Sequence, residues 1–310
     1  MKRFKNILYI VESETSLEDS VATKVISLAR INSATVTVVR VIEDGPFEQL
    51  SRTFFQKGKQ LTSLVIEQAE KDIHSFVSSS IWNGVQVSSE ILQGTGFISV
   101  IRKVLKDGHD LVIKRGSAPR GVDQLAMRLI RKCPCPIWVI QGSASGELRR
   151  VLGAIDAASE SNETKLLNKK IVELSHSLAQ REEGEAHYLY SWYLPSELIL
   201  QGPRFNLSDA EVQQMKEQLE HEGRNNVCRI LESAQIEPRH DHIHIKEGKT
   251  DEVIEKALKN LQIEVLVLGT IGRSGIPGLL IGNTVEKLLA RVQCSVLAVK
   301  PDDYESPVIL

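Results

Sequence analysis

Glycines are concentrated in one short segment near the end of the sequence. Five of them fall between Gly269 and Thr284, directly after the apolar run 265–268, and an apolar helical stripe follows. Glycine lets backbone N–H groups approach an anion closely, and a helix N-terminus, which Asn283 can cap, favours a phosphate. The segment predicts a phosphate-binding loop. The alternative is a glycine-rich turn without a ligand.

Three histidines alternate with other residues at His240, His242 and His244. In an extended conformation they would share one face, and imidazole is a ligand of zinc, nickel and copper. Two imidazoles spaced i,i+2 on one strand rarely reach the same ion. We therefore expect the solvated start of a strand here, without a metal.

Other chemical motifs are incomplete. Cys133 and Cys135 lack the CxxC spacing, and Gly248-Lys249-Thr250 lacks the first glycine of a P-loop. The sequence has no GxSxG or HExxH motif. No acid–base pair stands beside the glycine segment, so we expect a protein that is not an enzyme.

Composition excludes several classes of protein. The 310 residues are 42% hydrophobic and 25% charged, the balance of a soluble globular protein. With 38 basic against 40 acidic residues there is no basic excess, so nucleic acid is not expected as a partner. Apolar runs are far shorter than the roughly 20 residues of a membrane helix. The four cysteines favour the reducing cytoplasm.

The sequence contains an internal repeat. Segments of similar pattern occur in the same order in both halves: 5–12 with 149–156, 91–94 with 245–248, 110–113 with 264–267, and 135–140 with 294–299. A linker of small residues, 142–146, separates the copies. These marks predict two domains, 1–145 and 146–310.

Within each half, short apolar runs alternate with amphipathic segments. The first half predicts strands at 7–11, 34–41, 85–92, 110–113 and 137–140, and helices that include 47–79, 97–106 and 122–131. In the second half, Ser208 and Glu211 form a capping box before a long helix. Continuous apolar strands alternating with helices predict a parallel sheet covered on both faces, and therefore two doubly wound α/β domains.

The glycine segment resembles that of a known family. Gly269 and Gly272, a gap of nine residues and then Gly282 reproduce the spacing of the ATP-binding loop of universal stress proteins. The flanks EVLVLGTIGRSG and VEKLLARVQCSVLAVKP are similar to that family as well. The resemblance to its tandem members covers almost the whole chain. It implies a five-stranded parallel sheet in each half and an intramolecular pseudo-dimer joined through the last strands, with a further homodimer left open.

The resemblance also implies a ligand, which is ATP or a related adenine nucleotide bound by the second half. Gly269, Gly272, Gly282 and Asn283 would cradle its phosphates. The ATP binders of the family usually carry Ser or Thr at the position of Asn283. Asparagine retains a side-chain donor but lacks the hydroxyl, which Thr284 can supply one residue later.

Three further residues are placed by the resemblance. Arg273 would meet a terminal phosphate, or else be a solvated loop arginine. Asp156 would accept the ribose hydroxyls, or else cap a helix or turn. Trp192 would form a wall of the adenine site, or else belong to the core.

The first half departs from this pattern. Arg115 stands in place of Gly269, Ala118 in place of Gly272, and the loop is five residues shorter. Glu12 holds the place of Asp156 without the other site residues. We expect a degenerate, vacant site in this half; the alternative is that Lys114 and Arg115 bind a different anion.

These features together predict a regulatory protein of the stress response. The second half would bind the nucleotide, and binding would bias a surface for a protein partner that the sequence does not identify. Two alternatives stay open at this point. One is a slow ATPase that uses the same loop, and the other is an interaction scaffold without a nucleotide.

Overall fold

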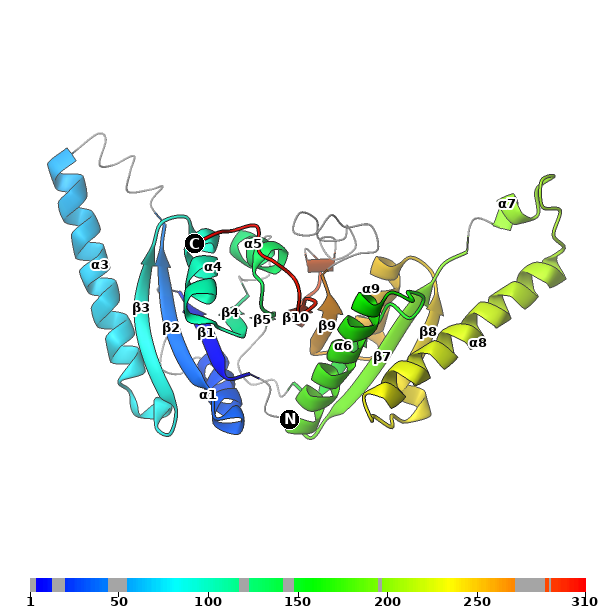
Figure 1. Cartoon of the computed structure of the whole chain (residues 1–310), viewed down its shortest axis with the longest axis horizontal. Helices are drawn as coiled ribbons and strands as arrows, with labels where there is room; N and C mark the ends of the chain where they lie inside the picture. The colour runs from blue at the N-terminus through cyan, green and yellow to red at the C-terminus, as the bar shows by residue number, and fades with distance from the viewer. Residues whose placement is uncertain are drawn as a thin grey trace. The chain divides into compact units, whose positions relative to one another are not determined.

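The computed structural model describes residues 4–12, 20–43, 55–116, 123–141, 148–194, 197–270, 288–289 and 291–310. The chain forms two compact units. The first holds the residues up to Gly146 and the C-terminal tail Tyr304–Leu310, and the second holds most of the chain from Glu147 to Asp303. Each unit is built around a parallel sheet (Figure 1).

The described part of the first unit has five strands in the order β3-β2-β1-β4-β5. Its elements in chain order are β1 (Asn6–Val11), α1 (Ser20–Asn32), β2 (Thr35–Ile42), α3 (Phe55–Val77), the 3-10 turn η1 (Ser80–Trp82), β3 (Gln86–Gln93), α4 (Gly96–Asp107), β4 (Leu111–Arg115), α5 (Gln124–Lys132) and β5 (Ile137–Ile140).

The second unit repeats this order as β8-β7-β6-β9-β10. Its described elements are β6 (Arg150–Ala154), α6 (Asn162–Arg181), β7 (Glu185–Trp192), α7 (Glu197–Leu200), α8 (Asp209–Ser233), the 3-10 turn η2 (His240–His242), β8 (Ile243–Glu247), α9 (Thr250–Asn260), β9 (Val265–Gly269) and β10 (Ser295–Val299).

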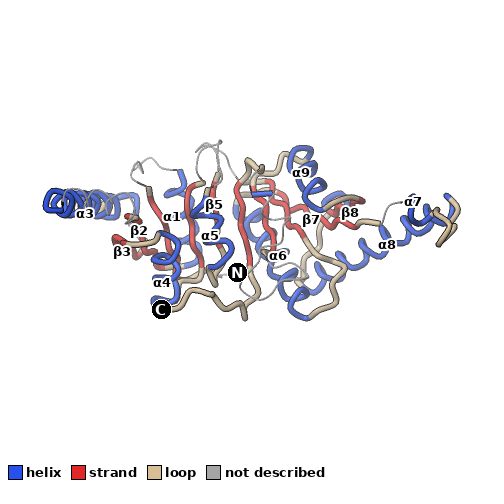
Figure 2. Tube along the Cα trace, turned by 90° about the horizontal axis from the view of Figure 1, so that it is seen from above, coloured by secondary structure: helices blue, strands red, loops and turns tan. Residues whose placement is uncertain are grey.

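The predicted fold class is confirmed in both units, because all strand pairs within each unit are parallel. In the second unit α6 packs against α8 on one face of the sheet, and α9 covers the opposite face (Figure 2). The central strands of both units are almost inaccessible to water, as Ile7 and Val112 show in the first unit and Val265 in the second. A strand buried on both faces must be apolar at successive positions, which is why it reads as a continuous apolar run.

Helix starts follow the sequence signals in part. The capping box is confirmed: Ser208 N donates to Glu211 Oε2 at 2.8 Å, and Glu211 N donates to Ser208 Oγ at 3.3 Å. The helix expected over 47–79 is α3, which begins at Phe55, and 44–54 lie outside the described residues. None of the described helices combines the length and the apolar composition needed to cross a bilayer.

The C-terminal tail differs from the sequence-based boundary, which placed all of 146–310 in the second domain. Tyr304 Oη donates to the carbonyl oxygen of Arg131 at 2.8 Å, and Arg102 Nε donates to that of Ile309 at 3.1 Å. These bonds attach the tail to the first unit. Nothing in the local pattern of the tail signals this, because both partners lie far away in sequence.

Candidate functional site

The second unit has a topological switch point between β6 and β9. From β6 the chain moves outward through β7 to β8, and it returns to β9 on the other side of β6, where Ala154 lies opposite Leu268. In such sheets ligands bind outside the carboxyl ends of the strands at the switch point. Asp156 follows β6 and Gly269 ends β9, so two predicted site residues follow neighbouring strands here.

Asp156 is held in place by an asparagine that the sequence analysis did not identify. Asn168 of α6 is buried and bonds the backbone of Asp156 twice: Asp156 N donates to Asn168 Oδ1 at 3.1 Å, and Asn168 Nδ2 donates to Asp156 O at 2.8 Å. The N-cap of α6 is Ser161, whose side chain accepts from Thr164 N. Asp156 is therefore not the cap of this helix, whereas a role as the cap of the turn at residues 157–158 stays an alternative to the ligand role.

Asn168→Ala should lower the free energy of unfolding by about 1–3 kcal/mol, because two backbone groups of Asp156 lose their partners. The nucleotide affinity should fall with it if Asp156 contacts the ligand. Denaturant unfolding and ATP titration measure the two effects. Asn162→Ala, the same change at an exposed position of α6, is the matched control and should stay within about 0.5 kcal/mol. Equal losses in both variants would contradict a positioning role for Asn168.

Trp192 ends β7 and is buried, with 7% of its surface exposed. It shares a face of the strand with Tyr190, whose ring lies so close to Gly223 of α8 that a Cβ there would be 2.8 Å from it. The burial of Trp192 favours the core role. Its indole Nε1 has no hydrogen-bond partner among the described residues.

Gly269 is in close contact with a helix. A Cβ at this position would lie 2.8 Å from Leu167 Cδ2 of α6. The packing of α6 over β9 therefore also favours a small residue here, and the ligand role that the sequence analysis assigned to Gly269 stays a prediction. The other predicted site residues, Gly272, Arg273, Gly282, Asn283 and Thr284, lie outside the described residues.

At the corresponding place in the first unit lies a buried lysine. Lys114 of β4 has a side chain only 2% exposed, and its ammonium forms an ion pair with Asp123 and donates to the carbonyl oxygen of Arg115 at 2.5 Å. Asp123 is also the N-cap of α5 and accepts from Ala126 N at 2.8 Å. Glu12, which follows β1, lies 3.8 Å from the same ammonium.

These contacts explain why the first unit should not bind a nucleotide. The helix N-terminus that a phosphate would use is already capped by Asp123. The ammonium of Lys114 is already paired with that carboxylate, so it is not available to an external anion. These contacts argue against Lys114 as a ligand of an external anion, while the vacant site expected in the first unit stays a prediction.

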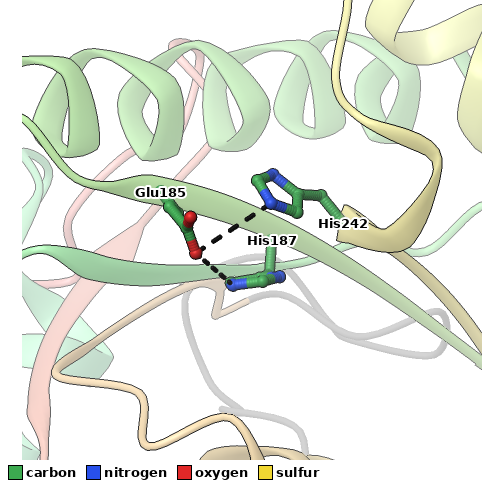
Figure 3. Close-up of side chains that lie close together, drawn as sticks. All are labelled: Glu185, His187 and His242. Carbon is green, nitrogen blue, oxygen red and sulfur yellow. Dashed lines mark ion pairs between the residues drawn. The ribbon is translucent and has the colours of Figure 1, made fainter.

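The histidine segment is not the extended, solvated stretch that we expected. Residues His240–His242 form the turn η2, so His240, His242 and His244 do not share one strand face, and the strand begins only at Ile243. His242 is buried, and two residues that the sequence analysis missed, Glu185 and His187 of β7, lie beside it (Figure 3). The spacing of Glu185 and His187, two positions apart on one strand, can be seen in the sequence, but the pairing of β7 with β8 cannot.

Two histidines here, His187 and His244, have a pKa below the ordinary histidine value. Burial lowers the pKa of His187, and the neighbouring His242 lowers it further. Burial, followed by the proximity of His187, lowers the pKa of His244 to about 4. A neutral imidazole retains a lone pair on one nitrogen, so each of these two rings can accept a hydrogen bond or bind a metal.

The fold defines a class of protein: a tandem pair of doubly wound α/β domains. The model of the universal stress protein family matches residues 3–141 and 147–300. The chain belongs to the universal stress protein family.

Known relatives extend over the whole chain. Universal stress protein E of Escherichia coli K12 is 26% identical over 321 residues, which cover 100% of this chain and 98% of that protein. Its homologue from Haemophilus influenzae is 24% identical, and the match covers 96% of this chain and 98% of that protein. Among solved structures, a functionally unknown protein from Pseudomonas aeruginosa PAO1 superposes with a TM-score of 0.67 at 20% identity, covering 98% of this chain and 95% of that one. A universal stress protein from Archaeoglobus fulgidus superposes with a TM-score of 0.58 at 13% identity, and the match covers 95% of this chain and 98% of that one.

Proposed function

We propose that this protein is a regulatory protein of the stress response that binds ATP or a related adenine nucleotide in its second unit. Membership in the universal stress protein family supports the role in the stress response. The observation that carries the nucleotide proposal is the arrangement at the switch point. There the ends of β6 and β9 lie side by side, and β9 leads directly into the glycine segment that begins at Gly269.

Each residue of the proposed site has a chemical task. The carboxylate of Asp156 would accept hydrogen bonds from ribose hydroxyls. The backbone N–H groups at Gly272 and Gly282 and the side chain of Asn283 would donate to phosphate oxygens. Arg273 would offer a guanidinium fork to the terminal phosphate. None of the residues that we assign to this site acts as a general base. We therefore propose a binding protein rather than an enzyme, and we propose that it is cytoplasmic.

Binding would act through a difference in affinity between two conformations of the protein. A ligand shifts such an equilibrium only by as much as it prefers one state over the other. The proposed regulatory consequence is that nucleotide contacts favour one arrangement of the glycine segment, and with it one surface for a protein partner.

A nucleotide-free interaction scaffold is the second candidate function. It is favoured by one specific observation, namely that Asn283 replaces the Ser or Thr usual among the ATP binders of the family. In that case the second unit would retain the fold and the glycine spacing without appreciable affinity for ATP.

Calorimetric titration of the full-length protein with ATP distinguishes these candidates. We expect one nucleotide per chain, because Lys114 and Asp123 occupy the corresponding place in the first unit. Mass spectrometry of small molecules released from the purified protein identifies which nucleotide it carries. Two equal sites per chain would contradict the assignment to the second unit, and the absence of binding would favour the scaffold.

A further inference from the structure

A second cluster of polar side chains lies at the opposite end of the second unit's sheet from the proposed nucleotide site. Glu185 is the first residue of β7, and His187 lies two positions later on the same face. His242 ends η2 directly before β8. Because Tyr188 pairs with Ile243, the neighbours of this pair bring His187 and His242 together at the amino ends of the two strands.

The three side chains point toward a common position (Figure 3). Glu185 Oε2 lies 3.8 Å from His187 Nε2 and 4.0 Å from His242 Nε2, and one ligand atom from each residue lies within 4.8 Å of the others. The rings of His187 and His242 have centroids 4.5 Å apart and are tilted by 52°. These separations are too long for hydrogen bonds, so no direct hydrogen bond explains the convergence.

The spacing is close to that of metal ligands. Two ligand atoms at zinc bond lengths and tetrahedral angles lie about 3.4 Å apart. The observed separations therefore need to shorten by a few tenths of an ångström or more. The carboxylate of Glu185 can shorten its own two distances, because its side chain is 51% exposed. The distance between the two ring nitrogens, which is within 4.8 Å, can shorten only by rotation of the two largely buried rings, of which 7% of His187 and 9% of His242 are exposed.

His244 supports His187 from behind. His187 Nδ1 lies 3.2 Å from His244 Nε2, at hydrogen-bonding distance. If His187 Nδ1–H donates this bond, its Nε2 keeps a lone pair on the side of Glu185. Histidines that bind metals are usually held in this way, with the second ring nitrogen donating to an outer acceptor.

The charges around the cluster are mixed. Asp241 Oδ1 lies 4.0 Å from His242 Nε2, and the same carboxylate accepts from Arg239 at 2.9 Å. The positive charge of Arg150 acts on His187, and the positive charges of Lys246 and Arg224 act on His244. Glu185 supplies the negative charge that lies within ligand distance of both rings.

We propose that Glu185, His187 and His242 bind a divalent transition-metal ion, for which Zn²⁺ is the best match. Two imidazoles and one carboxylate form a donor set typical of zinc, and a water molecule would complete four-fold coordination. β8 is the outermost strand of this unit. A bound ion would therefore link the start of the edge strand to its neighbour β7.

The experiment is calorimetric titration of the untagged, EDTA-treated full-length protein with Zn²⁺, with Mg²⁺ and Ca²⁺ as comparisons. We expect one Zn²⁺ per chain and no binding of the two hard cations, which prefer oxygen ligands. Glu185→Gln and His242→Ala should each lower the zinc affinity at least tenfold. His240→Ala removes an exposed imidazole from the same turn and should leave the affinity within twofold of the parent.

Two further measurements separate loss of binding from loss of folding. The circular dichroism spectrum of each variant in EDTA should match that of the parent. Glu185→Gln is the variant least expected to disturb folding, because the side chain of Glu185 is half-exposed. Zn²⁺ should also slow amide hydrogen exchange in β8 of the parent and not in Glu185→Gln. Retention of the parent affinity by either ligand variant, or absence of zinc binding by the folded parent, would overturn the proposal. Neither result bears on nucleotide binding at the other end of the sheet.

Discussion

Replacing Asp123 with alanine should lower the free energy of unfolding of the first unit by about 3–5 kcal/mol. The ammonium of Lys114 is buried, and Asp123 is the carboxylate with which it forms its close ion pair. Removing the carboxylate leaves a buried charge without a close counter-charge, because Glu12 is 3.8 Å away and largely exposed. About 1 kcal/mol of this loss comes from the N-cap of α5, which the variant also lacks. Urea unfolding followed by hydrogen exchange in β4 measures the change.

Two variants separate the ion pair from the cap. Asp123→Ser retains a good N-cap and removes only the charge, so it should recover about 1 kcal/mol of the loss. Adding Lys114→Leu to Asp123→Ser should recover most of the remainder, because an apolar side chain can replace a buried pair at little cost. Leu268 occupies the corresponding position of the second unit. If Asp123→Ala costs less than about 1 kcal/mol, the buried pair does not have the importance we assign to it.

Gly272→Val should lower the affinity for ATP at least tenfold, which corresponds to about 1.4 kcal/mol. In the proposed loop the backbone at this position approaches the phosphates, and a β-branched side chain would collide with them or force a strained backbone. Calorimetric titration of parent and variant measures the ratio. Gly278→Val is the matched control, since it places the same side chain on a glycine of the same segment outside the motif.

Asn283→Ser extends this test to the choice between nucleotide binding and scaffold. Serine restores the hydroxyl of the family's ATP binders and is a good helix cap. We expect the same or higher affinity than the parent. If the parent does not bind ATP and Asn283→Ser does, the scaffold is the better account. If Gly272→Val binds as well as the parent, the nucleotide is not in this loop.

The strands were the part of the fold that the sequence predicted best. The run 137–140 coincides with β5, and 7–11 falls within β1. Both strands are buried on two faces, so burial alone requires a continuous apolar run that can be read locally. Because the sequence repeats, the same pattern also predicts the strands of the second unit.

The partners of the candidate sites could not be predicted in the same way. Asn168 reaches Asp156 from α6, and Asp123 reaches Lys114 from the N-cap of α5. These contacts depend on how a helix packs on a sheet, and no spacing in the sequence encodes that. The prediction for the three histidines is wrong because it assumes an extended chain, whereas His240–His242 form a turn and the ring of His242 lies against that of His187 from β7.

The buried pair of Lys114 and Asp123 also limits the order in which mutations can change the first unit. On our proposal, a nucleotide site in the first unit would need glycines at positions 115 and 118, a longer loop, and replacement of Lys114 and Asp123. A pathway that loses Asp123 first passes through an intermediate weakened by about 3–5 kcal/mol, a large share of the 5–15 kcal/mol that typically holds a protein folded. Only pathways that replace Lys114 first avoid this intermediate. The two halves of one duplicated fold therefore differ in which substitutions each can accept, and in what order.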